Sequence, residues 1–544
     1  MSTISTAPGR TEPGVRGIPP GFASVLGVLA VGAAVGVGQL VAALVSPASS
    51  PVLAVGNAVI NYSPEPLTEF AKTHFGTNDK PILLSGMAVV ITAVAAAGGL
   101  ASRRFPRPGV VTVIVLGLAG LLAVVAATVF SPLDVIAPLV SLGVGLVVFR
   151  RLHGLALRVY QPLPEAGGPG TEPPEAAGES SGGVGRMSRR NVLFGSSAAL
   201  GVASLGSGIG GLLLADSGSS SRNAVTAALA KATLTERAPA IPAGASFAGS
   251  GTPAFITANP DFYRIDVALR IPSQTASDWR LRIHGMVERE TTLTFADLMS
   301  RPLVERTITL TCVSNPVGGN LISTANFIGV ELRPILLEAG IHPGAQQLFT
   351  TSIDGWNTST PTDVVLEPDR GALLAIGMNG EALPPEHGFP VRMIVPGLYG
   401  YVSGTKWLSD MEVTTFSARR GYWYQRGWAE QAPIKTESRI DRPRAGSSVP
   451  AGTFTCAGIA WSQPTGIEAV EVRVDGGPWQ AAQLSTEVNG RTWRMWRTDF
   501  DLAPGQHTVQ TRATNHDGAV QTEAVADPIP NGASGWPVTT FTAV

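Results

Sequence analysis

Five long apolar segments within the first 215 residues constrain this 544-residue chain more than any other feature. They span 22–45, 82–101, 109–130, 132–149 and 191–215, and their one acidic residue is Asp134. About 20 apolar residues cross the ~30 Å hydrocarbon layer as a helix, so the pattern predicts an N-terminal all-α transmembrane bundle. Buried core helices are the alternative, but five in succession without a charged face are not typical of a soluble core.

Arginines are concentrated on one side of these segments. If the N-terminus is cytoplasmic, eleven arginines lie on the inner side, whereas the outer loop 46–81 holds only Lys72 and Lys80. Inner loops carry the excess of basic residues, so five crossings place residues 216–544 outside the cytoplasmic membrane of a bacterial cell. The inner arginines are Arg10, Arg16, Arg103, Arg104, Arg107, Arg150, Arg151, Arg158, Arg186, Arg189 and Arg190.

Four helices within residues 1–158 are followed by a change in composition. Residues 159–187 are rich in Pro, Gly and Glu and cannot bury a core, which predicts a cytoplasmic linker. Ser188-Arg189-Arg190 comes next and leads into the weakly hydrophobic run 191–215. This order is typical of a twin-arginine signal, which addresses proteins exported already folded, so 188–215 is interpreted as a signal and fifth helix. Ordinary inner-side arginines are the alternative.

The remaining chain is predicted to contain two β-rich domains after a small, polar tether at 216–250. Short strand patterns interrupted by helical stretches near 295–300 and 332–339 predict an α+β domain over 251–428. Residues 429–544 alternate apolar and polar positions and carry the turn pair Asn489-Gly490, which favours an immunoglobulin-like β-sandwich. Such a domain typically packs or dimerises, so a homodimer is one expected assembly.

Charge, cysteine and histidine content exclude several classes of protein. Lys plus Arg number 39 and Asp plus Glu 40, so no basic field indicates nucleic acid binding. Only Cys312 and Cys456 are present, which excludes a multi-cysteine zinc site and an iron–sulfur cluster held by cysteines. His74 falls in the outer loop and His153 beyond the predicted fourth helix, so no haem is expected. Cys456 lies within a predicted sandwich strand and is interpreted as a buried apolar residue.

Cys312 ends a predicted strand in which Ile308, Leu310 and Cys312 share one face. A loop rich in small residues, 313–320, follows at once. This position suits a ligand at the mouth of a cavity, whereas a thiol that fills a core is the alternative. One thiolate alone cannot hold a typical zinc or copper site.

A second cluster lies between residues 386 and 407. His387, Arg392 and Lys406 fall within twenty residues and are separated by glycines that let backbone approach a ligand. Cations in this arrangement favour an anionic cofactor. A sheet edge with solvated charges explains each residue singly but explains their density less well.

With these motifs in view, residues 252–544 resemble the sulfite oxidase family of molybdopterin enzymes. The resemblance implies an α+β molybdopterin domain followed by an immunoglobulin-like dimerisation domain, with molybdenum–molybdopterin as cofactor and an oxidoreductase activity. It rests on the ordered motifs Thr-Cys-Val-Ser-Asn (311–315), Met-Asn-Gly-Glu (378–381), His-Gly-Phe-Pro-Val-Arg (387–392), Val-Pro-Gly (395–397) and Lys-Trp (406–407), with GIAWS (458–462) and EVRVDGGPW (471–479) in the second domain.

The resemblance also implies roles for individual residues. Cys312 would be the single protein thiolate on molybdenum, because the pterin dithiolene supplies the other sulfur donors. Arg264 matches an arginine near the metal and is the second catalytic candidate. The expected cofactor-binding residues are Phe262, Tyr263, Arg264, Asn315, His387, Arg392, Ser403 and Lys406.

Four positions depart from the sulfite oxidase pattern. Pro316 and Val317 replace two arginines, one of which helps to hold sulfite; Asp266 replaces a common His, and Trp356 replaces an expected Tyr. Loss of a cation and gain of an acid weaken the attraction for a dianion.

The leading hypothesis is therefore a membrane-anchored molybdenum enzyme that transfers an oxygen atom to or from a small molecule or sulfoxide. Its electrons would pass to a separate carrier, such as a cytochrome or a quinone-linked protein. A true sulfite oxidase is one alternative, and a membrane-tethered binding or sensor protein that has lost the metal is another.

Overall fold

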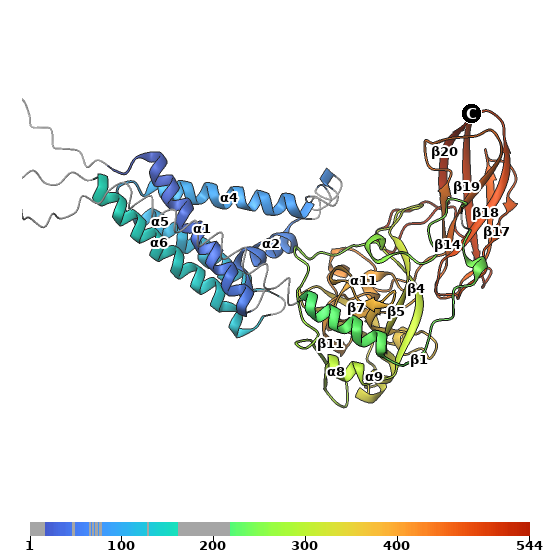
Figure 1. Ribbon diagram of the computed structural model, residues 1–544, viewed down its shortest axis with the longest axis horizontal. Coiled ribbons are helices and arrows are strands. Elements are labelled where there is room, and N and C mark those ends of the chain that lie inside the picture. Colours follow the sequence, from blue (N-terminus) through green and yellow to red (C-terminus); the bar gives the residue numbers. More distant parts are fainter. Residues whose placement is uncertain are drawn as a thin grey trace, which may run out of the picture. The chain divides into compact units, whose positions relative to one another are not determined.

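The computed structural model describes residues 17–45, 49–64, 67, 70, 74–75, 79–127, 130–160, 218–247 and 249–544. The chain divides into two compact units, residues 1–214 and 215–544 (Figure 1). The predicted fifth helix at 191–215, the linker at 159–187 and the arginine pair at 189–190 fall almost entirely outside the described residues.

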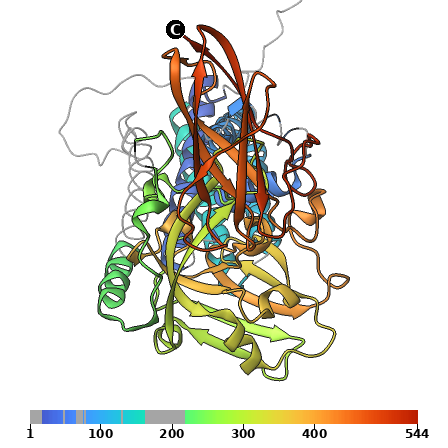
Figure 2. The ribbon, with the colours of Figure 1, turned by 90° about the vertical axis from the view of Figure 1, so that its right-hand side faces the viewer.

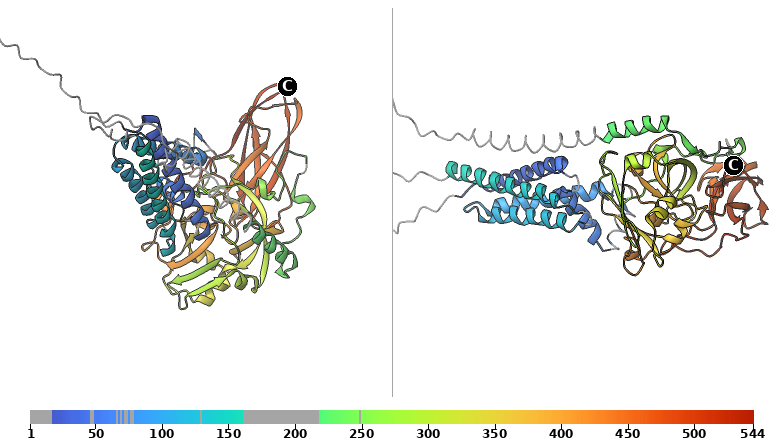
Figure 3. Two further views of the ribbon diagram at one scale, coloured as in Figure 1. Left: turned by 60° about the vertical axis from the view of Figure 1, so that its left-hand side comes forward. Right: turned by 90° about the horizontal axis from the view of Figure 1, so that it is seen from below.

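The first unit is helical because its sequence is dominated by uncharged apolar runs. The helices run side by side in the right-hand view of Figure 3, with α1 packed along α6 and α4 and with α5 packed against α6. Four of its segments, Pro20–Val45, Lys80–Ala101, Arg107–Val125 and Pro132–Arg158, are long and apolar enough to cross a membrane. The elements are α1 (Pro20–Val45), α2 (Pro51–Tyr62), α4 (Asp79–Ala101), α5 (Arg107–Val125), η3 (Pro132–Val135) and α6 (Ile136–Tyr160).

Small residues let α1 and α4 approach closely. A Cβ atom at Gly27 would lie 2.1 Å from the Ala95 carbonyl oxygen, and one at Gly99 would lie 2.2 Å from the Ala23 carbonyl oxygen. Larger side chains at either glycine would push the two helices apart. Asp134, the acid in the fourth apolar segment, accepts a hydrogen bond from the Ser131 amide at 2.7 Å and so caps the turn before α6.

The first unit differs from the sequence-based expectation in two places. Residues 51–62 form the helix α2, whereas the sequence pattern predicts an outer loop over 46–81. His153 was expected beyond the fourth helix, but it lies inside α6, buried, with its ring stacked on Phe149 and its Nε2 2.6 Å from the Ser102 carbonyl oxygen. The helix continues past Phe149 because Arg150 and Arg151 are good helix formers that follow the apolar run without a break.

The second unit begins with regular secondary structure where the sequence predicts a tether. Residues 218–231 are helical, and Val225 and Leu229 are buried in the main hydrophobic core. Strand β1 (Leu234–Glu236) then pairs in parallel with β4 (Leu303–Thr311). The composition of small and polar residues concealed these contacts, because only two apolar side chains anchor the helix.

Two sheets form the α+β part of this unit. The first has the order β1-β4-β5-β8-β10, with β9 paired to β8, and the second has the order β3-β2-β11-β6-β7. Both faces of β4 and β5 are buried, which explains their nearly continuous apolar and threonine content. The remaining strands are β2 (Arg280–Gly285), β3 (Thr291–Thr294), β5 (Ile322–Glu331), β6 (Gln347–Ser352), β7 (Asn357–Pro361), β8 (Leu373–Met378), β9 (Glu381–Ala382), β10 (Arg392–Ile394) and β11 (Leu408–Thr414).

Short helices lie between these strands. α9 ends at Gly340, whose φ of 72° is the left-handed conformation that glycine adopts most readily at a helix end. The helices and 3₁₀ turns are η4 (Ala243–Ala245), η5 (Asn259–Asp261), α8 (Phe295–Met299), α9 (Leu332–Ala339), α10 (Thr362–Leu366), η6 (Pro385–His387), α11 (Gly400–Ser403) and η7 (Tyr424–Arg426).

The C-terminal part consists of two further sheets, with orders β12-β14-β18-β17 and β13-β20-β19-β15-β16. Their strands face each other in Figure 2, where they are orange and red. Cys456 and Trp496 from one sheet and Val472 and Phe541 from the other are buried in a shared core, as the alternating sequence predicts. The strands are β12 (Glu437–Arg442), β13 (Ser448–Val449), β14 (Gly452–Trp461), β15 (Ile467–Val474), β16 (Gln480–Ala481), β17 (Gln483–Leu484), β18 (Arg494–Leu502), β19 (Gly505–Asn515) and β20 (Val538–Ala543).

Candidate active site

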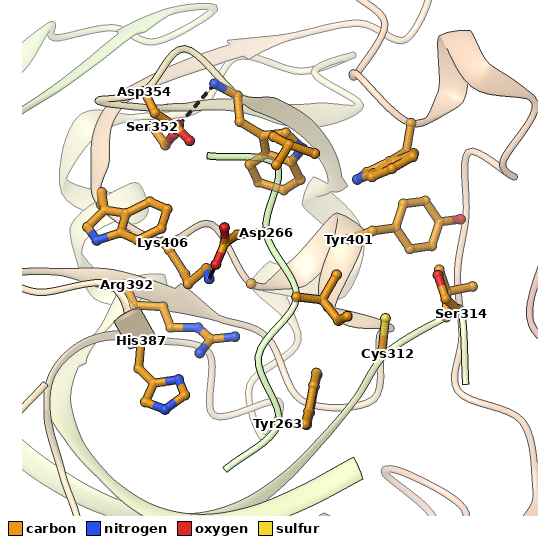
Figure 4. A pocket seen from close by; sticks show the side chains of 18 of the residues that line it. Tyr263, Asp266, Cys312, Ser314, Ser352, Asp354, His387, Arg392, Tyr401 and Lys406 are labelled. Atoms are coloured by element: carbon orange, nitrogen blue, oxygen red, sulfur yellow. Dashed lines mark hydrogen bonds and ion pairs between the residues drawn. The ribbon is translucent and has the colours of Figure 1, made fainter. Parts of the chain in front are cut away.

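A cavity with an empty volume of about 820 Å³, open mouth included, lies in the α+β part. The segments that follow β4 and β6 meet there with those that precede β10 and β11 (Figure 4). Its walls combine one thiol, two carboxyl groups, three basic side chains and six large aromatic rings. The lining residues are Tyr263, Ile265, Asp266, Val267, Cys312, Val313, Ser314, Ser352, Asp354, Trp356, His387, Arg392, Gly400, Tyr401, Gly404, Lys406, Trp407, Trp423 and Trp428.

Cys312 is the first residue after β4 and is 9% exposed. Its backbone is held on both sides, because its amide donates to the Leu321 carbonyl at 3.0 Å and its carbonyl accepts from the Asn315 amide at 3.1 Å. The Asn315 side-chain oxygen in turn accepts from the Leu321 amide at 2.9 Å. Burial raises the pKa of the Cys312 thiol, and hydrogen bonds from Ser314 oppose the rise. The loop thus places a neutral thiol at the cavity. A metal cation bound to its sulfur would displace the proton and stabilise the thiolate.

Arg392 and His387 form the basic end of the cavity. The Arg392 side chain is buried, and its Nε atom makes no hydrogen bond to any described residue. His387 lies against the Phe262 ring, with ring centroids 5.3 Å apart, and its Nε2 is 3.1 Å from the Asn259 carbonyl oxygen. Burial and then the nearby Arg392 guanidinium lower the pKa of His387 to about 4, so its ring is neutral at pH 7.

Lys406 is paired across the cavity. Its Nζ lies 2.9 Å from the Asp266 carboxylate and 3.1 Å from the Glu386 carbonyl oxygen. Burial lowers the pKa of Lys406 to about 8, although Asp266 opposes this shift. Arg264, whose side chain is 41% exposed, contacts the same carboxylate at 2.8 Å from outside. One buried carboxylate therefore balances two cations.

The opposite walls are aromatic. Trp407 has a φ of 50°, which is unusual for a bulky residue, and its indole N–H donates to the Pro385 carbonyl at 2.8 Å. Trp356 follows the β6 turn, and its amide donates to Asp354 at 3.2 Å. Burial raises the pKa of the Asp354 carboxyl, which also accepts a hydrogen bond from the Ser352 hydroxyl.

Five of the predicted site residues line this cavity, and four do not. Those that line it are Tyr263, Cys312, His387, Arg392 and Lys406. The other four have structural contacts instead: the Phe262 ring packs on His387, Arg264 binds Asp266 from outside, Asn315 closes the Cys312 loop, and the Ser403 hydroxyl donates to the Leu398 carbonyl at 2.9 Å. These four side chains are therefore not part of the cavity surface.

Sequence reading missed most of the aromatic wall. Tyr401, Trp407, Trp423 and Trp428 line the cavity but were assigned no role. Trp423 and Trp428 follow the last strand of the α+β part, β11, and their spacing carries no signal that they fold back. Asp354 was also missed, although an acid in a tight turn just before Trp356 was the available clue.

Comparison with known proteins places this cavity in a family. The domain family described as "Oxidoreductase molybdopterin binding domain" matches residues 268–423, which include Cys312, His387, Arg392 and Lys406. Sulfite oxidase from Gallus gallus is 31% identical over 320 residues, which are 50% of this chain and 69% of that protein. The chain belongs to the sulfite oxidase family. The family assignment made from the sequence motifs is thereby confirmed, and the chain is an oxidoreductase.

Other relatives are similar over smaller shares of their length. The chain is 30% identical to human mitochondrial sulfite oxidase over 321 residues, but it spans only 58% of that protein. Inducible nitrate reductase [NADH] 2 from Glycine max is 34% identical over 306 residues, 45% of this chain and 34% of that protein. The solved structure of the sulfane dehydrogenase SoxCD from Paracoccus pantotrophus covers 49% of this chain at 25% identity, with a TM-score of 0.43.

The cavity fits a molybdenum–molybdopterin group by its own chemistry. The described residues contain no cluster of three or more His, Cys, Asp or Glu side chains that could hold a metal, so a metal at Cys312 needs donors beyond those that these residues supply. A pterin dithiolene is such a donor set. The buried Arg392 guanidinium, whose Nε has no hydrogen-bond partner among the described residues, is complementary in charge to a phosphate group.

Proposed function

We propose that this chain is a membrane-anchored molybdenum-cofactor oxidoreductase that transfers an oxygen atom on a small neutral molecule such as a sulfoxide. The observation that carries the proposal is the shared cavity of a buried thiol, Cys312, and a buried arginine, Arg392, beneath an aromatic wall. The thiol and the arginine suit the metal and the phosphate of one cofactor. The aromatic wall suits an uncharged substrate.

The protein's own groups then have distinct roles. Cys312 provides the thiolate ligand, and Arg392 binds the cofactor phosphate. Lys406, held by Asp266, and the neutral His387 orient the pterin. Tyr263 lines the cavity next to Cys312, and burial raises the pKa of its hydroxyl, so that this group stays protonated and can donate a hydrogen bond. The molybdenum–pterin group, when bound, supplies the two-electron oxygen-transfer chemistry.

Charge balance in the cavity argues against a dianionic substrate. Among the lining residues the basic side chains are His387, Arg392 and Lys406. His387 is neutral at pH 7, Lys406 is paired with Asp266, and Arg392 is assigned to the cofactor phosphate. No lining cation is then left to hold sulfite. Sulfite oxidases usually carry arginines at the positions of Pro316 and Val317. These two residues are uncharged and do not line the cavity, so they supply no positive charge for sulfite.

The four candidate membrane spans support a role of the first unit as an anchor. We propose that the catalytic part lies on the extracytoplasmic side, as the distribution of arginines predicts, and that a separate carrier such as a cytochrome exchanges the electrons. The C-terminal pair of sheets is proposed as an immunoglobulin-like module through which two copies associate. Protease digestion of right-side-out membrane vesicles tests the location, because residues 216–544 should be cleaved without detergent.

Turnover by the purified full-length chain tests the substrate proposal. Dimethyl sulfoxide reduction is followed with a reduced viologen dye, and sulfite oxidation with an oxidised dye, on protein whose molybdenum content has been measured. A missing charge-assisted contact costs about 1.5–3 kcal/mol. The value of kcat/KM for sulfite should therefore be about 10–100-fold lower than that of an enzyme that has such a contact. Saturable dimethyl sulfoxide turnover with poor sulfite turnover is the expected result.

Sulfite oxidation is the second candidate, because the chain is 31% identical to a protein named sulfite oxidase. Efficient, saturable sulfite oxidation at low sulfite concentration would favour it and contradict the charge argument. Protein purified without molybdenum or pterin from cells that make the cofactor would instead favour a binding or sensor role.

A further inference from the structure

The connector Arg419–Trp428 (RRGYWYQRGW) folds back against the catalytic part rather than simply linking it to the next domain. The Gly421 amide donates to the Ser359 hydroxyl oxygen at 3.1 Å, and the Tyr422 amide donates to the Asn357 carbonyl at 3.2 Å. A Cβ at Gly421 would lie 3.1 Å from the Ser359 backbone nitrogen, so glycine permits this close approach. The start of the connector is therefore fixed on strand β7.

The far end of the connector is fixed as well. The Tyr401 hydroxyl, on α11, donates to the Ala429 carbonyl at 2.6 Å, just after Trp428. The Thr358 hydroxyl donates to the Tyr401 carbonyl at 2.5 Å and so ties α11 to the same strand, β7. Both ends of the connector thus share one rigid support, and the rings between them have defined positions.

This arrangement brings Trp423 and Trp428 to the cavity beside Tyr401. The Trp423 and Trp428 ring centroids are 6.1 Å apart at an interplanar angle of 78°, and those of Tyr401 and Trp428 are 5.8 Å apart at 51°. We name these three rings the aromatic corner. Tilted and edge-to-face contacts are arrangements that aromatic rings prefer, so the three rings pack together as one apolar part of the cavity wall.

The aromatic corner contains no charged side chain. The charged lining residues come from other segments, and Figure 4 shows Arg392 and His387 on the left of the view, with Tyr401 and Cys312 together on the right. The one hydroxyl of the corner, on Tyr401, already donates to Ala429. The cavity is therefore divided, with a basic end for an anionic cofactor group and an apolar end next to the thiol.

We propose that the aromatic corner is the substrate-recognition wall and that Trp423 and Trp428 determine specificity for compact dialkyl sulfoxides, whose alkyl groups pack against it. This inference rests on the proposed function and names its substrate class. In the reaction the S=O bond breaks, the sulfur centre is reduced by two electrons from a reduced external carrier, and the oxygen leaves as water with two protons. The corner binds the alkyl groups and excludes oxyanions and larger aryl sulfoxides.

Steady-state kinetics of the full-length, molybdenum-loaded enzyme test the inference, with reduced viologen as electron donor. Trp423→Leu and Trp428→Leu should each raise KM for dimethyl sulfoxide about tenfold while kcat changes less than about twofold, because the lost contact acts on binding. The preference for dimethyl sulfoxide over methyl phenyl sulfoxide should also fall, because the smaller side chains make room. Trp423→Phe, which keeps an aromatic face, should retain most of the affinity.

Tyr424→Leu is the matched control. Tyr424 belongs to the same connector, but its ring packs on Arg420 and does not line the cavity. This variant should leave both KM values unchanged. The molybdenum content of each variant distinguishes weaker substrate binding from misfolding. Trp423 is only partly buried, so the KM of its variants tests the inference if Trp428→Leu does not fold.

The outcomes separate the two claims. Wild-type turnover of dimethyl sulfoxide with an unchanged KM and unchanged preference in the Trp423 variant overturns the inference and leaves the proposed function standing. A molybdenum-loaded wild type that turns over sulfite but no sulfoxide overturns the proposed function, and the inference with it.

Discussion

Replacement of Arg392 by Met should change the stability of the apoprotein and its affinity for the cofactor in opposite directions. Arg392 is 6% exposed, and its Nε has no hydrogen-bond partner among the residues that the structure describes. Burial lowers the pKa of this guanidinium, but arginine remains charged at any ordinary pH. Without cofactor, the fold therefore contains a buried positive charge that has lost water contacts and gained too few hydrogen bonds from the protein to replace them.

The two effects differ in size. A buried ion costs several kcal/mol, and the open cavity hydrates part of the guanidinium, so Arg392→Met should stabilise the apoprotein by about 1–3 kcal/mol. When a phosphate is bound, each charge-assisted hydrogen bond contributes about 1.5–3 kcal/mol, so loss of two of them should weaken cofactor binding by at least about 100-fold. The variant should be more stable when empty yet hold less pterin.

Thermal melts of apoprotein from a strain that cannot make pterin give the first quantity. Pterin fluorescence and molybdenum content of protein from a competent strain give the second. Arg439→Met is the control, because Arg439 is similarly buried but binds Asp441 at 2.7 Å and does not line the cavity. It should lose stability and keep its pterin. Full pterin content in Arg392→Met would refute the assignment of a phosphate to this arginine.

Two further predictions concern buried carboxyl groups. Asp266→Asn leaves the buried Lys406 without its carboxylate partner and should destabilise the protein by about 3–5 kcal/mol in urea denaturation, whereas Arg264→Met, at an exposed position, should cost less than about 1 kcal/mol. Equal losses would contradict the pairing. Burial raises the pKa of the Glu437 carboxyl from 4.5 to about 8, so the folded state holds its proton more tightly than the unfolded chain and loses stability as the pH rises between these values. Glu437→Gln should therefore raise the melting temperature more at pH 9 than at pH 5, and an equal effect at both pH values would contradict the shift.

The sequence predicted which polar side chains line the cavity better than it predicted the aromatic ones. Cys312, Arg392 and Lys406 could be identified because their residue types are chemically specific and lie in short motifs with restricted backbone. Arg264, expected near the metal, and Ser403, expected to bind the cofactor, do not line the cavity, because their side chains have other partners. Arg264 binds Asp266, and the Ser403 hydroxyl binds the preceding backbone.

The rest of the cavity depends on tertiary structure that local patterns do not encode. Trp423 and Trp428 reach it only because the connector is hydrogen-bonded to β7 and α11, which are separate in sequence. The helix at 218–231 was missed for a related reason, since a segment of small and polar residues becomes ordered when Val225 and Leu229 enter a core formed by distant strands. His153 was misplaced because the end of a helix is the least certain part of a pattern reading.

The most direct test of the account is the number of sulfur atoms bound to molybdenum, measured by X-ray absorption on the full-length enzyme and on Cys312→Ser. Serine replaces the thiolate by an oxygen donor of nearly the same size, so the fold should persist. The account predicts one sulfur neighbour fewer and a collapse of turnover in Cys312→Ser, with no change in Cys456→Ser, whose thiol is buried between the C-terminal sheets. An unchanged sulfur count, or full turnover, in Cys312→Ser would show that Cys312 is a core thiol and that the metal site lies elsewhere.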